Sequence, residues 1–198
     1  NQPLKIVYAG TFADKDGVSD IIEGFSRFND LYKNAELILT GNSEQQIIYV
    51  DKYKNRKDIV FTGYIPDKEF YELLRYADVL CMCRTESEFA NAGFPFKLGE
   101  YLATGNPVVC TRVSDVQYYL NEDDAYLIEP GDPDAIANTL KRIVANPAEA
   151  RLKGTNGLKK CMMFFSPDSN GKLLLELLLS FDKGYKMVNR EIPQSYNS

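Results

Sequence analysis

The segment from Gly93 to Val109, GFPFKLGEYLATGNPVV, carries a lysine and a glutamate three residues apart, at Lys97 and Glu100. A glycine and a proline come just before this pair and again just after it, so a short helix over residues 96–104 is expected. Lys97 then lies near the helix N-terminus, where free backbone N–H groups and the helix dipole favour an anion. Glu100 follows one turn later, within reach of a hydroxyl on a group attached to that anion. A diphosphate joined to a ribose fits this pattern.

The same helix has a simpler interpretation. Leu98, Tyr101 and Leu102 would pack on a sheet, and Lys97 and Glu100 would form a solvated i,i+3 pair on the opposite side. The spacing alone leaves both interpretations open.

The loop from Gly10 to Val18, GTFADKDGV, connects an apolar run to a helical pattern. Gly10 and Gly17 let a ligand approach the backbone closely, and Lys15 adds a positive charge, so the loop, with Thr11 after its first glycine, could cradle a phosphate. It matches neither the dinucleotide-binding glycine fingerprint nor a P-loop. An ordinary turn between a strand and a helix is the alternative.

Two further polar loops follow apolar runs. Residues 84–91, RTESEFAN, offer Arg84, Glu88 and Asn91 as pocket-lining side chains, because such loops often carry the chemistry of α/β proteins. Tyr64, in the loop from Gly63 to Pro66, could meet a flat base. A solvated loop and a plain turn are the respective alternatives.

Strand-like apolar runs and helical stripes alternate along the chain, which predicts a parallel α/β sheet of about six strands with helices on both faces. The expected strands are 4–10, 36–41, 59–63, 77–83, 107–111 and 125–129. The first expected helix begins near Val18. The other expected helices cover 67–76, 96–104, 132–145, 148–163 and about 170–183. One Rossmann-like domain over residues 1–183 and a frayed polar tail over 184–198 follow from this pattern. Ligands of such sheets bind beyond the carboxyl ends of the strands, where the candidate loops lie.

Composition limits the classes of function. The chain has 198 residues, a net charge of −5 and no histidine. The acidic balance argues against a nucleic-acid partner, and the missing histidine excludes Ser–His or Cys–His nucleophile pairs and His-ligated metals within the chain. We expect neither a metal nor a cofactor. No apolar run is long enough to cross a bilayer, and the four cysteines lack zinc-like spacing, so a cytoplasmic location is expected.

Several segments together resemble the group-1 family of GT-B glycosyltransferases. YAGTF at 8–12, VFTGYIP at 60–66 and IEPGDPDAIANTLKRIV at 128–144 are similar to family segments at matching spacings. The segment that resembles the family's nucleotide-sugar motif contains Asn91, Pro95, Lys97, Glu100–Tyr101–Leu102–Ala103, Gly105 and Pro107–Val108–Val109. The resemblance covers about residues 4–182.

This resemblance implies an enzyme with two Rossmann-like domains, of which the C-terminal one binds a UDP- or GDP-sugar. Sugar transfer in the family needs no metal and usually retains the anomeric configuration. Glu100 corresponds to the glutamate that holds the ribose hydroxyls. Lys97 and the backbone around Phe94, Pro95 and Phe96 correspond to diphosphate contacts, so Lys97 and Glu100 are the expected catalytic residues. Lys15 is the nearest candidate for the family's first-loop lysine.

Three positions depart from the family pattern. Thr11 stands where the first loop often has arginine, Asp16 where it often has lysine, and Ala92 where a second glutamate is common. These departures keep two alternatives open: half of a GT-B nucleotide-sugar epimerase, or a non-catalytic nucleotide-binding or scaffold module.

Only three residues precede the first expected strand, so we interpret the chain as the donor-binding half of a longer enzyme. The expected partners are a nucleoside-diphosphate sugar and the missing N-terminal acceptor domain. The last helix resembles one that crosses back toward that domain in whole enzymes. Any membrane contact, at the inner face, would come through the missing half, and polysaccharide or cell-envelope glycan synthesis is the expected pathway.

Overall fold

The computed structural model describes residues 2–42 and 44–182. The prediction of a frayed tail over residues 184–198 therefore lies outside the described residues.

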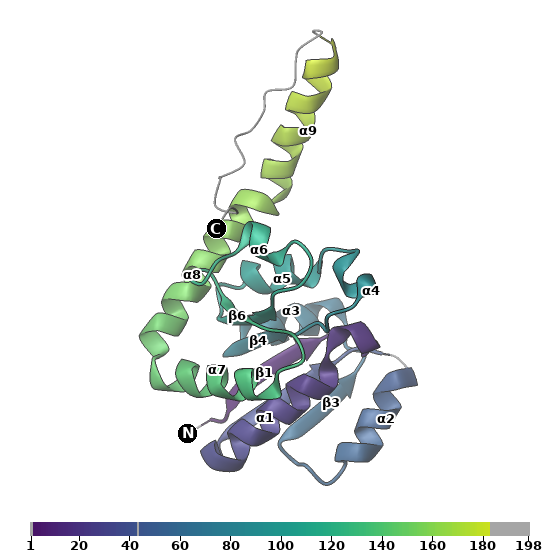
Figure 1. Cartoon of the computed structure of the whole chain (residues 1–198), viewed down its shortest axis with the longest axis vertical. Helices are drawn as coiled ribbons and strands as arrows, with labels where there is room; N and C mark the ends of the chain where they lie inside the picture. The colour runs from purple at the N-terminus through teal and green to yellow at the C-terminus, as the bar shows by residue number, and fades with distance from the viewer. Residues whose placement is uncertain (1, 43, 183–198) are drawn as a thin grey trace.

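Six parallel strands form one sheet in the order β3-β2-β1-β4-β5-β6, as the alternating pattern predicts (Figure 1). Each strand lies within two residues of its expected bounds. The strands are β1 (Leu4–Ala9), β2 (Ala35–Thr40), β3 (Ile59–Gly63), β4 (Val79–Met82), β5 (Val108–Thr111) and β6 (Tyr126–Ile128).

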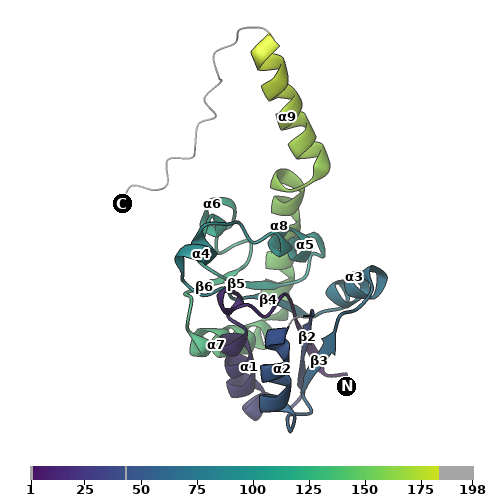
Figure 2. The same ribbon diagram turned by 90° about the vertical axis from the view of Figure 1, so that its right-hand side faces the viewer.

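Helices cover both faces of the sheet because successive strand residues point to opposite sides. Ile6 and Tyr8 belong to the core on one face, whereas Val7 and Ala9 belong to the core on the other. The first face is covered by α1 (Val18–Tyr32), α2 (Glu44–Tyr53) and α7 (Pro133–Ala145), and the second by α3 (Asp67–Arg75) and α5 (Lys97–Ala103) (Figure 2). The long helix α8 (Pro147–Phe164) contributes to both cores.

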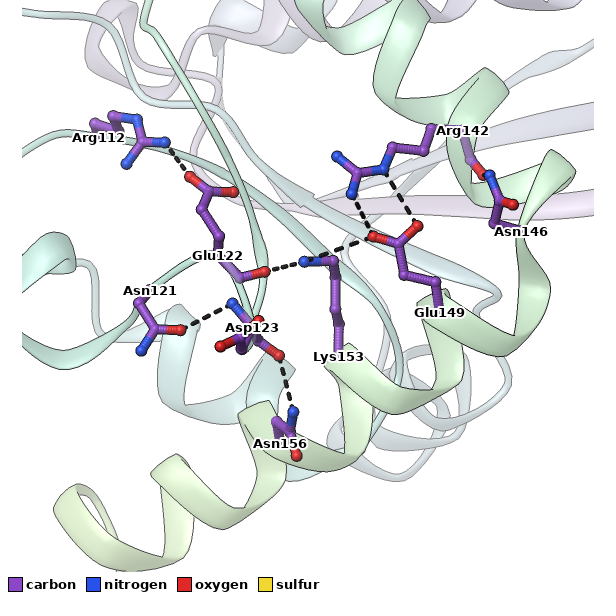
Figure 3. A network of polar contacts seen from close by, with 9 residues as sticks. All are labelled: Arg112, Asn121, Glu122, Asp123, Arg142, Asn146, Glu149, Lys153 and Asn156. Atoms are coloured by element: carbon purple, nitrogen blue, oxygen red, sulfur yellow. Dashed lines mark hydrogen bonds and ion pairs between the residues drawn. The ribbon is translucent and has the colours of Figure 1, made fainter.

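The first half of α8 is fixed to the loop before β6 by a polar network (Figure 3). Lys153 is only 7% exposed, and its Nζ donates to the backbone oxygen of Glu122 and lies 3.8 Å from Glu149 Oε1. Asn156 Nδ2 donates to the backbone oxygen of Asp123 at 3.0 Å. A buried ammonium is costly unless it is paired, so these contacts explain how α8 accommodates a lysine on its inner side.

The last helix, α9 (Pro167–Asp182), points away from the body of the domain (Figures 1 and 2). It begins a few residues earlier than expected, because the Ser166 hydroxyl accepts from the Ser169 amide at 3.2 Å and Pro167 suits the first helical position. Its large apolar side chains are between 41% and 75% exposed: Leu173, Leu174, Leu175, Leu177, Leu178, Leu179 and Phe181.

Four short elements were not expected from the sequence. They are η1 (Asp14–Asp16), α2, α4 (Glu88–Asn91) within the polar loop, and α6 (Val116–Tyr119). Helix α2 lacks a clear apolar stripe, because Ile47 and Ile48 are 68% and 69% exposed and Gln46 is its buried residue. The other three have four residues or fewer, too few for a helical period to be visible.

Candidate functional site

The order of the strands creates a crevice at the carboxyl end of β1. From β1 the chain moves outward to β2 and β3 on one side, then returns to β4 on the other side. The pairing of β1 with β4 covers Ile6↔Val79 and Val7↔Leu80, and the strands part before β1 ends. Ligands of open parallel sheets bind at such a reversal, because the loops leaving the two strands diverge. A cavity of about 200 Å³ lies there.

This cavity brings together the loop after β1, the end of β4 and the start of α5. It is lined by seven of the predicted site residues: Gly10, Thr11, Lys15, Arg84, Pro95, Phe96 and Lys97. Four lining residues were not predicted as site residues: Tyr8, Ala9, Asp16 and Met82. The charged groups of the lining are thus three cations and one carboxylate.

The Asp16 carboxylate organises the loop after β1. Its Oδ2 accepts hydrogen bonds from the Tyr8 hydroxyl at 3.1 Å, from Thr11 Oγ1 at 2.9 Å and from the Ala13 amide at 3.3 Å. Burial, and then the charge of Asp16, raise the pKa of Tyr8, so its phenol remains a donor. A Cβ at Gly10 would lie 1.9 Å from the Tyr8 hydroxyl oxygen, so a larger residue there would have to displace the Tyr8 ring from its contact with Asp16.

The loop after β1 also touches the end of β4. Gly17 has a φ of 60°, and a Cβ there would lie 1.9 Å from the backbone oxygen of Cys83. A side chain is excluded by both the left-handed conformation and this close approach. The contact places Lys15 and Arg84 on the same cavity.

The Arg84 side chain is hydrogen-bonded to the segment before α5. Its Nη1 donates to the backbone oxygen of Gly93 at 2.8 Å, and its own backbone oxygen accepts from Thr111 Oγ1 at 2.8 Å. Within the described part of the chain, no carboxylate forms an ion pair with it. Burial lowers the pKa of Arg84, and Asp16 acts in the opposite direction. A partly buried guanidinium without a carboxylate partner is suited to an incoming anion.

Lys97, the first residue of α5, and Phe96 just before it line the cavity, but two of the first three amides of the helix are already used. The amides of Leu98 and Gly99 donate to the backbone oxygens of Pro95 at 2.8 Å and Phe96 at 3.1 Å. The helix also has only seven residues. The anion-binding capacity of this end therefore depends more on the Lys97 charge than on free helix amides.

Five predicted site residues do not belong to the cavity lining: Tyr64, Glu88, Asn91, Phe94 and Glu100. Tyr64 follows β3, which is separated from β1 by β2, and it is 71% exposed. Glu88 is exposed on α4. Glu100 is partly buried on α5, three residues after Lys97.

The other two of these residues shape the surroundings of the cavity. Asn91 Oδ1 accepts from the Ser114 amide at 2.9 Å, which joins α4 to the loop after β5. The Phe94 ring packs 5.3 Å from Tyr119 and 5.2 Å from Phe165, measured between ring centres. Its side chain is therefore held in an aromatic cluster.

The unpredicted lining residues carried only weak sequence signals. Tyr8 and Met82 belong to apolar runs that predict buried strands, not contact with a ligand. Asp16 stands where the family resemblance predicts a lysine, and its carboxylate would not be assigned to an anion site. Within residues 2–42 and 44–182, no group of three or more potential metal ligands occurs, and no helix is long and apolar enough to span a membrane.

Comparison with known proteins adds family information to this geometry. A family model described as "Glycosyl transferases group 1" matches residues 1–160. An MMP alpha-(1->4)-mannosyltransferase of Mycolicibacterium hassiacum is 31% identical over 112 residues, which are 55% of this chain and 26% of the relative. The chain spans less than half the length of the curated relatives it matches.

Solved structures share the fold at low identity. HepE from Anabaena, solved in complex with UDP, superimposes with a TM-score of 0.78 and 16% identity, over 90% of this chain and 49% of that one. The same protein has been solved with UDP-glucose. A sucrose-phosphate synthase from Thermosynechococcus elongatus gives a TM-score of 0.75 and 23% identity, over 93% of this chain and 46% of that one.

Proposed function

We propose that this chain, which belongs to the glycosyl transferases of group 1, binds the nucleoside-diphosphate sugar donor of a larger sugar-transferring enzyme. The observation that carries the proposal is the cavity at the strand-order reversal, which combines Lys15, Arg84 and Lys97 from three separate segments. The likeness to a protein solved with UDP and UDP-glucose supports the same ligand class.

The charges of the cavity suit a diphosphate. Three cations and the Asp16 carboxylate leave an excess of positive charge, although the chain as a whole carries −5. Negative charge grows on the diphosphate as its bond to the sugar breaks, and fixed cations that face that charge stabilise the transition state. We therefore propose metal-independent transfer in which Lys97 binds the diphosphate. Retention of the anomeric configuration is proposed from the family alone.

Glu100 is proposed to hold the ribose hydroxyls. It follows Lys97 by three residues on α5, so a ribose attached to the bound diphosphate would extend along this helix beyond the cavity. We propose that Tyr64, Glu88 and Asn91, in loops at the same carboxyl edge of the sheet, contact outer parts of the donor. The backbone around Phe94 and Phe96 is proposed to contact the diphosphate.

The size of the cavity supports a second domain. Its volume of about 200 Å³ is below the roughly 300–1,000 Å³ typical of small-molecule sites. A donor held here would be partly uncovered. We propose that an N-terminal acceptor domain of the same polypeptide closes the cleft, in keeping with relatives about twice as long. The chain alone is then expected to bind the donor without transferring the sugar.

Helix α9 is the proposed contact with that domain. Leu174 and Leu178 are both 56% exposed, and Phe181 is 75% exposed. A large exposed apolar surface marks an interaction site, and the polypeptide that the relatives have in addition is the occupant we propose. Asp168, Lys172 and Glu176 form a polar stripe of mixed charge along the helix, which does not favour an anionic membrane surface.

The four cysteines are free and buried, which suits a reducing compartment. We accordingly propose a cytoplasmic location and a role in polysaccharide or cell-envelope glycan synthesis. The whole enzyme would sit at the inner face of the membrane only through its other half.

Titration calorimetry of the 198-residue chain tests the donor proposal. UDP and GDP are titrated separately, with uridine and guanosine as matched ligands that lack phosphate. We expect one diphosphate to bind at millimolar concentration or below, and its nucleoside to bind at least tenfold more weakly. A folded chain that binds neither diphosphate would instead support a scaffold module that has lost the site.

A further inference from the structure

Lys15 has an aromatic partner beside the cavity. Its ammonium lies 4.5 Å from the centre of the Phe89 ring, on α4. Among the described residues, no carboxylate forms an ion pair with Lys15. The adjacent Asp16 carboxylate accepts from Tyr8 and Thr11 instead. The Phe89 ring therefore orients the Lys15 ammonium.

Core packing does not explain an aromatic residue at position 89. Phe89 is 70% exposed, whereas its neighbour Ala90 is fully buried and anchors α4 to the domain. The Ser87 hydroxyl accepts from the Ala90 amide at 3.1 Å and begins the short helix. Phe89 is thus held on a fixed turn with its ring largely in solvent, except where Lys15 covers it.

Hydrogen bonds to the backbone hold the segments that carry Lys15 and Phe89 next to each other. The Thr85 amide donates to the backbone oxygen of Lys15 at 2.9 Å, and Thr85 Oγ1 donates to that of Asp14 at 3.3 Å. These bonds join η1 to the segment that leads into α4. The ring and the ammonium are therefore placed by connected backbone and do not meet as two free surface side chains.

We propose that Phe89 is a positioning residue that holds Lys15 toward the diphosphate without neutralising it. The negative face of an aromatic ring attracts an ammonium, but the ring carries no net charge and cannot cancel that of the lysine. A carboxylate in the same place would hold Lys15 equally well and would compete with a phosphate for it. This inference rests on the proposed function, because it assigns a task to a residue outside the donor cavity.

The test measures UDP or GDP affinity, whichever is tighter, for the 198-residue chain with Phe89→Leu and Phe89→Tyr. Leucine keeps the apolar bulk but has no ring, whereas tyrosine restores the ring. We expect Phe89→Leu to weaken diphosphate binding by about two- to fivefold, the effect of an exposed cation–π contact. Phe89→Tyr should retain the parent affinity, and uridine or guanosine binding should not change in either variant.

A double-mutant cycle with Lys15→Met separates positioning from direct contact. We expect Phe89→Leu to have no further effect once Lys15 is replaced. Equal losses in both backgrounds would mean that Phe89 touches the nucleotide itself, and an unchanged affinity in Phe89→Leu would remove it from the site. Either of these two results overturns the inference on Phe89 and leaves the proposed function standing. A parent chain that binds no diphosphate overturns the inference and the proposed function together.

Discussion

The hydroxyl of Tyr101 on α5 accepts a hydrogen bond from the backbone amide of Ala9 at 2.8 Å, at the last residue of β1. The pairing of β1 with β4 runs through Ile6 and Val7 and does not include Ala9. The two strands therefore part near Ala9, and the phenol accepts the hydrogen bond of its amide. Tyr101 is fully buried, and burial raises its pKa. This contact joins the helix that carries Lys97 directly to the strand that opens the cavity.

Replacement of Tyr101 by phenylalanine tests this link. The variant keeps the ring but leaves the buried Ala9 amide without its partner, which should lower the free energy of unfolding by about 1–3 kcal/mol. Urea unfolding followed by circular dichroism measures the change. Tyr71→Phe is the control, since Tyr71 is 57% exposed and should change stability by less than about 0.5 kcal/mol. Equal effects of the two substitutions would contradict the interpretation.

Lys97→Met should weaken diphosphate binding while keeping the aliphatic stem of the side chain. We expect a loss of more than about 1.4 kcal/mol, a tenfold change in the dissociation constant, because the charge faces the cavity. Calorimetry with UDP and GDP measures it. Lys141→Met on α7, outside the cavity lining, is the matched control. A dissociation constant that does not change in Lys97→Met would remove Lys97 from the site.

Glu100→Gln tests the ribose assignment. UDP and its 2′,3′-dideoxy analogue are compared, or the GDP pair if GDP is the ligand. The parent chain should prefer the natural ribose by about 1–3 kcal/mol, because a carboxylate that loses its hydroxyl partners is left unsatisfied. In Glu100→Gln this preference should shrink to less than about 0.5 kcal/mol, below the usual net value of one hydrogen bond. A preference that persists in the variant would assign ribose recognition to other residues.

The ion pair of Asp58 with Arg56 should make part of the free energy of unfolding depend on pH in the acid range. Arg56 donates to both of its carboxylate oxygens at 2.8 Å and, with help from Asn29, lowers the pKa of Asp58 to about 2. The pKa is lower in the folded state than in the unfolded state, so the unfolded chain binds the proton first. The stabilisation is complete above about pH 4 and is lost as the pH falls toward 2.

Solvent screening reduces the size of this effect to about 1 kcal/mol. Urea unfolding of the parent chain and of Asp58→Asn between pH 5 and pH 2.5 measures it. The stability of the parent chain should fall more steeply with acid than that of the variant. Parallel curves for the two proteins would show that Asp58 titrates alike in both states.

Leu174→Glu combined with Leu178→Glu tests the assignment of α9. Both leucines are 56% exposed, so the isolated chain should keep its free energy of unfolding within about 0.5 kcal/mol. Leu98→Ala, at a fully buried position, is the positive control and should cost about 2–5 kcal/mol. In the whole enzyme, the α9 variant should lose stability. A comparable loss in the isolated chain would mean that α9 packs on its own domain.

The sequence alone was sufficient to predict the fold and to point to several residues of the candidate site. Apolar runs that alternate with helical stripes, and glycine or proline at their ends, depend on neighbouring residues. They therefore predicted six parallel strands and the helix that carries Lys97 within a few residues. Helix α2 was missed because its exposed Ile47 and Ile48 give no apolar stripe. Glycines and lysines placed after an apolar run or at a helix start follow the same local logic, and they led to Gly10, Lys15 and Lys97 at the cavity.

The tertiary structure decided which loops share that cavity. The placement of β4 beside β1 brings Arg84 to Lys15 and leaves Tyr64 beyond β2. Nothing in the local spacing shows that Asp16 turns toward Tyr8, that Tyr101 accepts from Ala9, or that Lys15 lies over the Phe89 ring. These contacts join residues on different elements, and they exist only because strand order and register bring those elements together.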